Sequence, residues 1–427
     1  MPSPIPSPQP PSRFALRPSL FVALIVTLIT LVTAAFAVDA VRDAATLASV
    51  SEASLVRPTS YLAIEPVSSV LDTLTLLTVG QHIALAVWVI GLFIVLRVVF
   101  ARRHGTAARR EVWAAVALLA IIFVVYAAGA MMPRPMAQLE TSDPTVLTAD
   151  FHSHTKYSHD GRRGWTEDDV REWHRAAGYD VAYVTDHATY EGAERGVASN
   201  PGQAGQGTIL LQGLEAYFHG EHVNLLSAGR RYKGLTTPDL KDLDEQSLTL
   251  ASFLPQTAPV IIETIPGNLS KVSAAGAGKP GMSAIEIVDG SPRGLSQTRR
   301  QRQRIVHLAD SLDLALVTGS DNHGWGRTAP GWTMLRIPGW RGMRSDSLSS
   351  IIEQALRVGR RASTRTVERT VASGDAASLA FALPTIAWRM FTTLSADERV
   401  AWMIWTWGLV LVGRAVRRWR PRPSVAA

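Results

Sequence analysis

The strongest constraint on this chain is a set of long apolar runs with almost no charge. The first extends from Ser19 to Val38 without a charged residue, the second from Leu77 to Phe100 and the third from Val112 to Met132. At about 1.5 Å per residue in a helix, each can cross the roughly 30 Å hydrocarbon core of a bilayer. The runs therefore predict transmembrane helices over 19–38, 77–100 and 112–132.

A fourth transmembrane helix is expected at 398–416, where an apolar run rich in tryptophan continues into a cluster of arginines. The stretch 376–390 is apolar but short and contains a proline, which favours an interfacial helix over a span. Residues 1–18 and 417–427 are expected to be cytoplasmic tails.

Arginine clusters predict how these helices are oriented. The loop 101–111 carries Arg102, Arg103, Arg109 and Arg110 between two spans, which is the signal that the positive-inside rule weighs most heavily. With four spans, this loop is cytoplasmic, and the loop 39–76 and the large middle segment lie outside. We therefore expect a protein integral to the cytoplasmic membrane of a bacterium, with an extracytoplasmic domain.

Two further observations bear on the exported part of the chain. Ala35 and Ala37 form an A-x-A pattern, so cleavage of the first apolar segment as a signal peptide stays open, and both alternatives export the loop 39–76. The net charge of +7 is largely accounted for by the arginines beside the spans. Nucleic acid is therefore a weak expectation as a partner.

The absence of cysteine narrows the chemistry of the exported domain. With no cysteine in the chain, disulfides, thiolate zinc sites and cysteine nucleophiles are excluded. Histidine, aspartate, glutamate and water remain as ligands for a metal ion.

Residues 146–373 alternate short β-rich runs with helical stretches, which predicts an α/β domain built on mostly parallel strands. Strands are expected at 146–150, 181–184, 209–212, 223–226, 260–263, 284–288 and 314–318. Helices are expected at 167–177, 296–312 and 345–358. Thr166 and Asp169 have the spacing of a capping box that opens the first of these helices.

Histidines and carboxylates follow the ends of these predicted strands. They are His152, His154, Asp160, His187, Glu215, His222, Asp321 and His323. In an extended segment the two imidazoles of a His-x-His pair point to one side, a geometry that suits chelation. Loops that leave the carboxyl ends of parallel strands converge on one face, so several of these groups are expected to meet in a metal site.

The motifs DFHSHTKYSHDG (150–161), VTDH (184–187), GLE (213–215), HVNLL (222–226) and GSDNH (319–323) resemble the PHP (polymerase and histidinol phosphatase) family in order and spacing. The resemblance covers about residues 148–365. It implies a distorted (β/α)7 barrel with two or three divalent metal ions, zinc, manganese or iron. It also implies hydrolysis of phosphoesters by a metal-activated water that attacks phosphorus.

Carried over by position, the resemblance implies one metal site from His152, His154, Glu215 and Asp321. Glu215 bridges to a second site with His222, and a third contains Asp160, His187 and His323. Asp150 and Asp186 are adjacent to ligands and are candidates for orienting imidazoles. Arg162, Arg163 and Arg327 are candidates for binding the substrate phosphate.

Two positions depart from the family pattern. Ile265 stands where a histidine of the second site is expected, so either that site is depleted or Glu263, two residues earlier, replaces the missing ligand. SHDG replaces the usual SDG, so His159 competes with Asp160, and we favour Asp160 because it keeps the Asp-Gly pair. His174 and His307 follow no strand and are interpreted as ordinary helix residues.

These features favour a membrane-tethered, metal-dependent phosphoesterase acting on a phosphorylated small molecule, lipid or surface polymer outside the cytoplasm. A non-catalytic domain that binds metal or phosphorylated polymers is one alternative, motivated by Ile265. A metal hydrolase of carbon–nitrogen or carbon–oxygen bonds is another. A transport component is disfavoured because charges in the spans lie only near their ends.

Overall fold

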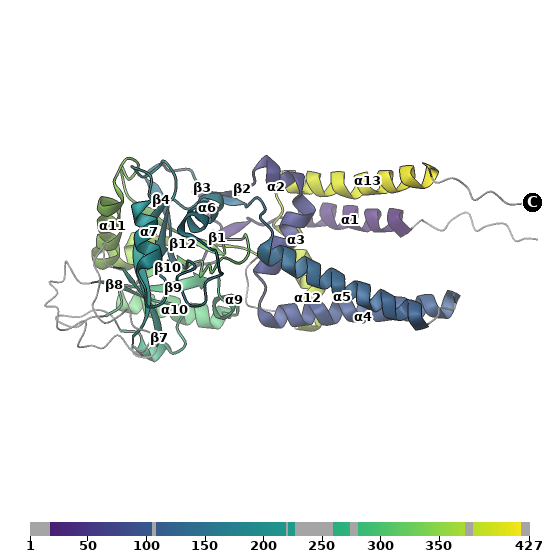
Figure 1. Ribbon diagram of the computed structural model, residues 1–427, viewed down its shortest axis with the longest axis horizontal. Coiled ribbons are helices and arrows are strands. Elements are labelled where there is room, and N and C mark those ends of the chain that lie inside the picture. The colour runs from purple at the N-terminus through teal and green to yellow at the C-terminus, as the bar shows by residue number, and fades with distance from the viewer. Residues whose placement is uncertain are drawn as a thin grey trace, which may run out of the picture.

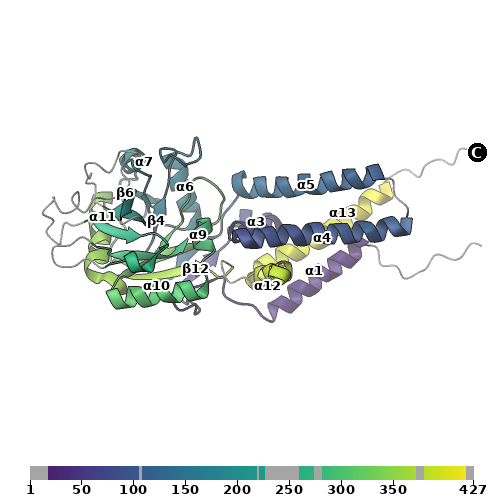
Figure 2. The same cartoon turned by 90° about the horizontal axis from the view of Figure 1, so that it is seen from below.

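An α/β domain lies at one end of an elongated molecule, and long helices extend from it along the molecular axis (Figure 1). The computed structural model describes residues 18–104, 108–218, 221–226, 259–273, 281–371 and 379–419. The expected tails 1–18 and 417–427 lie almost entirely outside the described residues. The view from below shows the same separation between the strands and the helical bundle (Figure 2).

The domain is built on a ten-stranded sheet. Its strands, in spatial order, are β1 (Val41–Asp43), β12 (Thr364–Arg369), β11 (Gly331–Arg336), β4 (Val146–Ser153), β5 (Val181–Val184), β6 (Ile209–Phe218), β7 (Glu221–Leu226), β8 (Val260–Glu263), β9 (Ala284–Asp289) and β10 (Ala315–Gly319). A separate two-stranded sheet pairs β2 (Ala53–Val56) with β3 (Gln138–Thr141). The predicted α/β class is therefore confirmed.

The sheet is mixed, which corrects the expectation of mostly parallel strands. Neighbours are parallel from β4 to β6 and from β8 to β10. By contrast, β7 is antiparallel to both of its neighbours, and β11, β12 and β1 add antiparallel pairs at the other edge. The tight β6–β7 connection requires an antiparallel pair, because a parallel crossover needs a dozen or more residues. β11, β12 and β1 were absent from the predicted strands.

The sheet curls so that its last parallel strand approaches β4. A bridge joins Ser153, at the end of β4, to Asn322, just beyond β10. The Thr318 N–H in β10 donates to Oγ1 of Thr333 in β11 at 2.8 Å. This curl brings the carboxyl ends of β4, β5, β9 and β10 around one point, as a barrel would.

Helices cover the outside of the curled sheet. They are α6 (Glu167–Ala177), α7 (Glu191–Ala198), α9 (Pro292–Leu295), α10 (Arg299–Leu312) and α11 (Ser345–Gln354), with short turns at Leu269–Lys271, Ala355–Gly359 and Arg360–Ser363. Helix α6 has the predicted bounds and the predicted capping box, since Thr166 and Asp169 each accept a hydrogen bond from the other's backbone N–H. Gly178 ends it at a φ of 84°, which a residue with a Cβ adopts only with strain.

In the described ranges, the helical bundle contains two helices that are long and apolar enough to cross a membrane, spanning Val79–Phe100 and Ala108–Met131. They belong to α4 (Val79–His104) and α5 (Ala108–Met131). The other helices are α1 (Pro18–Ala34), α2 (Thr59–Ala63), α3 (Glu65–Thr75), α12 (Ala382–Thr392) and α13 (Ala396–Trp419), with a 3₁₀ turn at Leu379–Phe381. α1 is apolar but shorter, and α13 is not among the described helices that are long and apolar enough to cross a membrane.

A buried ion-pair cluster joins the bundle to the domain. Asp72 of α3 accepts from Arg134, which follows α5, at 2.6 Å and from Arg369 of β12 at 2.8 Å. Oγ1 of Thr328 and the hydroxyl of Tyr61 donate to the same carboxylate at 2.9 and 3.1 Å. Burial alone would raise the pKa of Asp72, but the two guanidinium groups outweigh burial and lower it.

We expect Asp72→Ala to destabilise the protein strongly, because two buried guanidinium groups would lose their common counter-charge. Breaking such a pair on one side costs about 3–5 kcal/mol. Thermal unfolding of the full chain in detergent should show a midpoint lowered by several degrees. The exposed Asp39→Ala variant serves as the control, and equal midpoints for both variants would contradict this role.

Candidate metal centre

The predicted ligand residues converge at the carboxyl edge of the curled sheet. His152 and His154 leave the end of β4, His187 follows β5, and Asp321 and His323 follow β10. Glu215 lies within β6. His222 is the second residue of β7, and because β7 is antiparallel to β6, the start of β7 lies at this same edge. The fold thus brings together side chains that are far apart in the chain.

Within the part of the chain that the structure describes, four groups of side chains have ligand atoms within 4.8 Å of one another. They are His152, His154, Glu215 and Asp321; His154, Asp160, His187 and His323; His187, Glu215 and His222; and His152, Glu286 and Asp289. The first three contain all eight predicted ligands and overlap through His154, His187 and Glu215. The fourth adds Glu286 and Asp289, which the sequence analysis did not identify.

Glu215 is the shared carboxylate of the cluster. Its Oε2 lies 2.9 Å from Nε2 of His152, 3.2 Å from Nε2 of His154 and 3.4 Å from Nε2 of His187. Its Oε1 lies 2.6 Å from Nδ1 of His222. One oxygen therefore faces three imidazoles and the other faces a fourth, as expected for a carboxylate placed between two cation sites.

Asp160 belongs to the cluster, whereas His159 does not. Oδ2 of Asp160 lies 3.1 Å from Nε2 of His323 and 3.4 Å from Nε2 of His187. The ring of His159 contacts the ring of His187 but joins none of the metal-capable groups of described residues. Of the two residues, only Asp160 therefore lies in a described group that could hold a metal ion, and its assignment as a ligand stays a prediction.

The electrostatics of the cluster are those of a cation site. Burial would lower the pKa of His154, but Asp321 and Glu215 outweigh burial and raise it to about 10. Conversely, burial would raise the pKa of Glu215, yet the imidazoles, His152 first, hold it well below its usual range. For Asp321, burial would likewise raise the pKa, but His152, His154 and His323 together outweigh burial and lower it to about 2. The carboxylates thus attract positive charge to the imidazole nitrogens, where a divalent cation could replace the protons.

The donor geometry fits a metal better than hydrogen bonding. Both ring nitrogens of His154 and Nε2 of His323 are buried and have no hydrogen-bond partner among the described residues. Nε2 of His154 nevertheless lies 3.2 and 3.3 Å from carboxylate oxygens of Glu215 and Asp321. Asp321 has a φ of 47°, in the left-handed region that costs energy for a residue with a Cβ. Neutral imidazoles and carboxylates are suitable ligands for zinc, manganese or iron.

Glu286 orients His152. Its Oε1 lies 3.0 Å from Nδ1 of His152, so the other ring nitrogen faces Glu215 and Asp321. A Cβ at Gly319 would lie 2.5 Å from Oε1 of Glu286 and 2.7 Å from Cβ of His152, so only glycine permits this approach. Glu286 lies in the middle of a predicted strand and not at its end. The only sequence signal for its role was that alternate residues of a strand point to the same side.

Asp150 and Asp186 support the backbone near the ligands instead of contacting the imidazoles of predicted ligands. Asp150 accepts from the Ser320 N–H at 2.8 Å and pairs with Nε2 of His174 at 2.7 Å. Asp186 accepts from the N–H and hydroxyl of Thr155, both at 2.6 Å. His174, interpreted from sequence as an ordinary helix residue, is therefore a buried partner that links α6 to β4.

The three candidate phosphate-binding arginines have different surroundings. Arg162 stacks on the rings of Trp165 and Trp325. Nε of Arg327 donates to the backbone oxygen of Arg134 at 3.2 Å. Arg163 is exposed. Their assignment to substrate binding stays a prediction.

The alternative ligand Glu263 points away from the cluster. It pairs across the sheet with Val223, whose side chain belongs to the outer apolar core with Ile261 and Ile285. Burial, followed by the charge of Glu221, raises the pKa of Glu263 to about 8. Ile265 is also buried and lines a separate cavity beside α10. Among the described residues, the metal-capable group that contains His222 therefore consists of His187, Glu215 and His222 only.

Comparisons with known proteins give distant likenesses. No family model matches the chain, and no curated protein matches it. PsfC from Pseudomonas syringae is 17% identical over 56% of this chain and 96% of its own, with a TM-score of 0.35. A two-domain protein from Bacteroides vulgatus, containing a predicted PHP-like metal-dependent phosphoesterase, is 17% identical over 53% of this chain and 65% of its own, with a TM-score of 0.33.

A further neighbour acts on nucleic acid. The lesion-specific endonuclease PfuEndoQ from Pyrococcus furiosus is 14% identical over 50% of this chain and 56% of its own, with a TM-score of 0.36. Endonuclease Q is also found in complex with a 27-mer duplex substrate.

We expect Glu286→Leu to weaken metal binding by about 10- to 100-fold, because Nδ1 of His152 would lose the acceptor that orients the ring. Titration against a chromogenic chelator measures the affinity. Glu286→Gln keeps an acceptor oxygen and should retain most of the affinity. Equal losses in the two variants would show that Glu286 acts by its charge or packing instead.

We expect Glu263→Gln to stabilise the protein at high pH. A carboxyl whose pKa is raised on folding contributes stability below about pH 4.5, and this is lost as the pH rises through about 8. The variant should therefore unfold at a higher temperature than wild type at pH 8 but not at pH 4.5. The exposed Glu191→Gln variant is the control, and a fall in metal content on changing Glu263 would restore it as a ligand.

Proposed function

We propose that this protein is a membrane-anchored hydrolase of phosphoester bonds that uses divalent metal ions. The observation that carries this proposal is the overlap of three metal-capable groups through His154, His187 and Glu215. Cations held a few Å apart, when bound, lower the pKa of water and stabilise charge on the oxygens of a phosphate.

The residues of the chain would divide this work by position. His152, His154, Glu215 and Asp321 would hold one cation, and Glu215 would share its second oxygen with a neighbouring site that includes His222. Asp160, His187 and His323 would hold a third at the exposed side of the cluster. Glu286 keeps His152 in the tautomer that presents Nε2 to the centre.

The proposed reaction needs no nucleophile from the protein. The oxygen of water forms a bond to phosphorus while the bond from phosphorus to the leaving oxygen breaks. The proton released by water is taken up by the leaving alcohol. The largely buried cluster supports this reaction because it consists of histidines, aspartates and glutamates that could hold cations and contains no cysteine to act as a nucleophile.

Exposed apolar surface supports anchoring in a membrane. None of the residues in the most apolar 18-residue stretches of α4 and α5 is buried, and Val87 and Phe123 are 65% and 72% exposed. Such a surface is unfavourable in water. Arg102, Arg109 and Arg110 lie at the ends of α4 and α5 that are far from the α/β domain (Figure 1). By the positive-inside rule, this position of the arginines supports a domain outside the cytoplasm.

The test compares metal content and hydrolysis in the full-length chain. We expect wild type to hold two or three divalent ions and to hydrolyse p-nitrophenyl phosphate or bis-p-nitrophenyl phosphate with Mn²⁺, Zn²⁺ or Fe²⁺. His152→Ala combined with His154→Ala should lower turnover by more than about 100-fold. The exposed His307→Ala variant is the matched control. Bound metal without turnover of any phosphoester would favour a binding domain or another hydrolase.

A further inference from the structure

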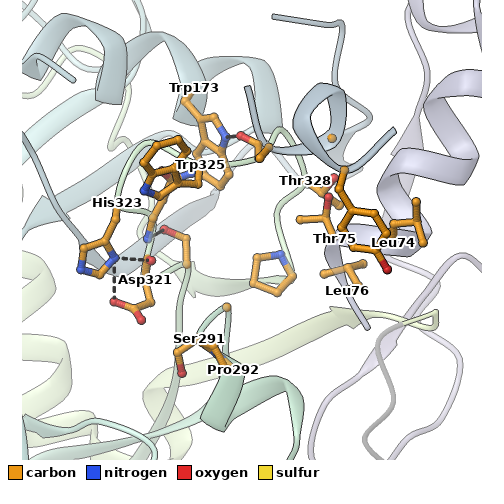
Figure 3. Close-up of a pocket in the computed structure, with 18 of the residues that line it drawn as sticks. Leu74, Thr75, Leu76, Trp173, Ser291, Pro292, Asp321, His323, Trp325 and Thr328 are labelled. Atoms are coloured by element: carbon orange, nitrogen blue, oxygen red, sulfur yellow. Dashed lines mark hydrogen bonds and ion pairs between the residues drawn. The ribbon is translucent and has the colours of Figure 1, made fainter. Parts of the chain in front are cut away.

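A cavity of about 590 Å³ extends from the metal-capable cluster to the ends of α4 and α5. Asp160, Asp321 and His323 line its end in the α/β domain. Figure 3 shows Asp321 and His323 on one side of this cavity and Leu74, Thr75 and Leu76 of the bundle on the other. The cavity is therefore shared between the candidate centre and the helices that are apolar enough to cross a membrane.

Away from the ligands the lining contains more apolar residues and no charged ones among the described residues. In the bundle its apolar residues are Leu74 and Leu76 at the end of α3, and Val125, Gly129 and Ala130 of α5. The cavity is thus continuous from groups that attract cations to the part of the bundle that carries the exposed apolar surface. An occupant that matches both ends has one charged end and one apolar end.

A neutral polar pair also lines the end of the cavity that lies in the bundle. His82 of α4 and Tyr126 of α5 both line the cavity, and Nδ1 of His82 lies 2.8 Å from the hydroxyl of Tyr126. Each lies about one helical turn from the helix end nearest the domain. Amphipathic aromatic side chains are enriched at this depth, where lipid headgroups meet the hydrocarbon.

The charge of the lining argues against a polyanion. Among the described residues that line the cavity there is no lysine or arginine. Binding of a nucleic acid or a phosphorylated polymer depends on several cationic side chains along the backbone. The lining instead suits a ligand with its phosphate at the ligand cluster and few other charges. The cavity volume is also that of a small-molecule site, not of a duplex.

We propose that the substrate is an amphiphilic phosphoester taken directly from the membrane. Its phosphorus lies at the cluster of Asp160, Asp321 and His323, and its hydrocarbon chain passes Leu74 and Leu76 toward α4 and α5. This inference rests on the proposed phosphoesterase function and adds its substrate class. The cavity between the bundle and the domain then serves as the route by which a lipid headgroup reaches the metal centre while the hydrocarbon chain stays in the bilayer.

The first test uses binding and is independent of turnover. The full-length protein in lipid nanodiscs is irradiated with a long-chain alkyl phosphonate that carries a diazirine near the end of its chain. We expect cross-links, mapped by mass spectrometry, on α4 and α5 near His82 and Tyr126. An excess of a phosphonate with a long chain should compete, whereas methylphosphonate at the same concentration should compete much less. Cross-links spread evenly over the bundle would overturn the proposal.

The second test separates the apolar end of the cavity from the centre. Val125→Trp fills the cavity, and Val124→Trp is a matched control because Val124 is 60% exposed on another side of α5. We expect Val125→Trp to lower hydrolysis of a long-chain phosphoester at least 10-fold and that of p-nitrophenyl phosphate less than 2-fold. Val124→Trp should change neither rate by more than 2-fold.

The outcomes distinguish the two proposals. Hydrolysis of the short ester with no loss of long-chain hydrolysis in Val125→Trp, and no cross-links at the cavity, would overturn the lipid substrate and leave the phosphoesterase standing. If wild type hydrolyses neither ester, the phosphoesterase proposal fails, and the cross-linking pattern still decides whether a long-chain phosphonate occupies the cavity.

Discussion

The guanidinium groups of Arg134 and Arg369 both pair with the carboxylate of Asp72. The contact between the helical bundle and the α/β domain depends on these ion pairs. Each of the three charges is buried, and a buried charge is tolerated only when it is paired and hydrogen-bonded. Because the three residues come from α3, from the segment after α5 and from β12, the pairing also sets how α5 approaches the sheet. The cavity at this junction has its shape for the same reason.

The loop after β10 connects this junction to the metal-capable cluster. Asp321 and His323 at its start belong to the groups that could hold a metal ion. A few residues later the N–H of Gly326 donates to the backbone oxygen of Ala130 in α5 at 2.8 Å, and Thr328 donates to Asp72. One short segment therefore contacts the candidate centre, the apolar helix α5 and the ion-pair cluster. A change in the position of α5 would be transmitted to two of the ligands through these hydrogen bonds.

The predictable part of the site depended on local spacing. His152 and His154 were identifiable because alternate residues of a strand share a side, and Asp321 and His323 because they directly follow a buried strand. Glu286 was missed because its role depends on the neighbouring strand and on the missing Cβ of Gly319. Glu263 has the right chemistry, but its position opposite Val223 turns it to the other face of the sheet.

The sequence by itself determined the α/β class of the domain, the apolar helices α4 and α5, and the side chains able to bind metal, because periodicity and residue chemistry are local properties of a chain. Tertiary structure alone decided the antiparallel β7 and β11, the partnership of Asp150 with His174, and the cavity between Asp321 and Tyr126. These features join residues far apart in the chain. Their positions depend on strand register and on the compensation of buried charge, which no stretch of sequence specifies alone.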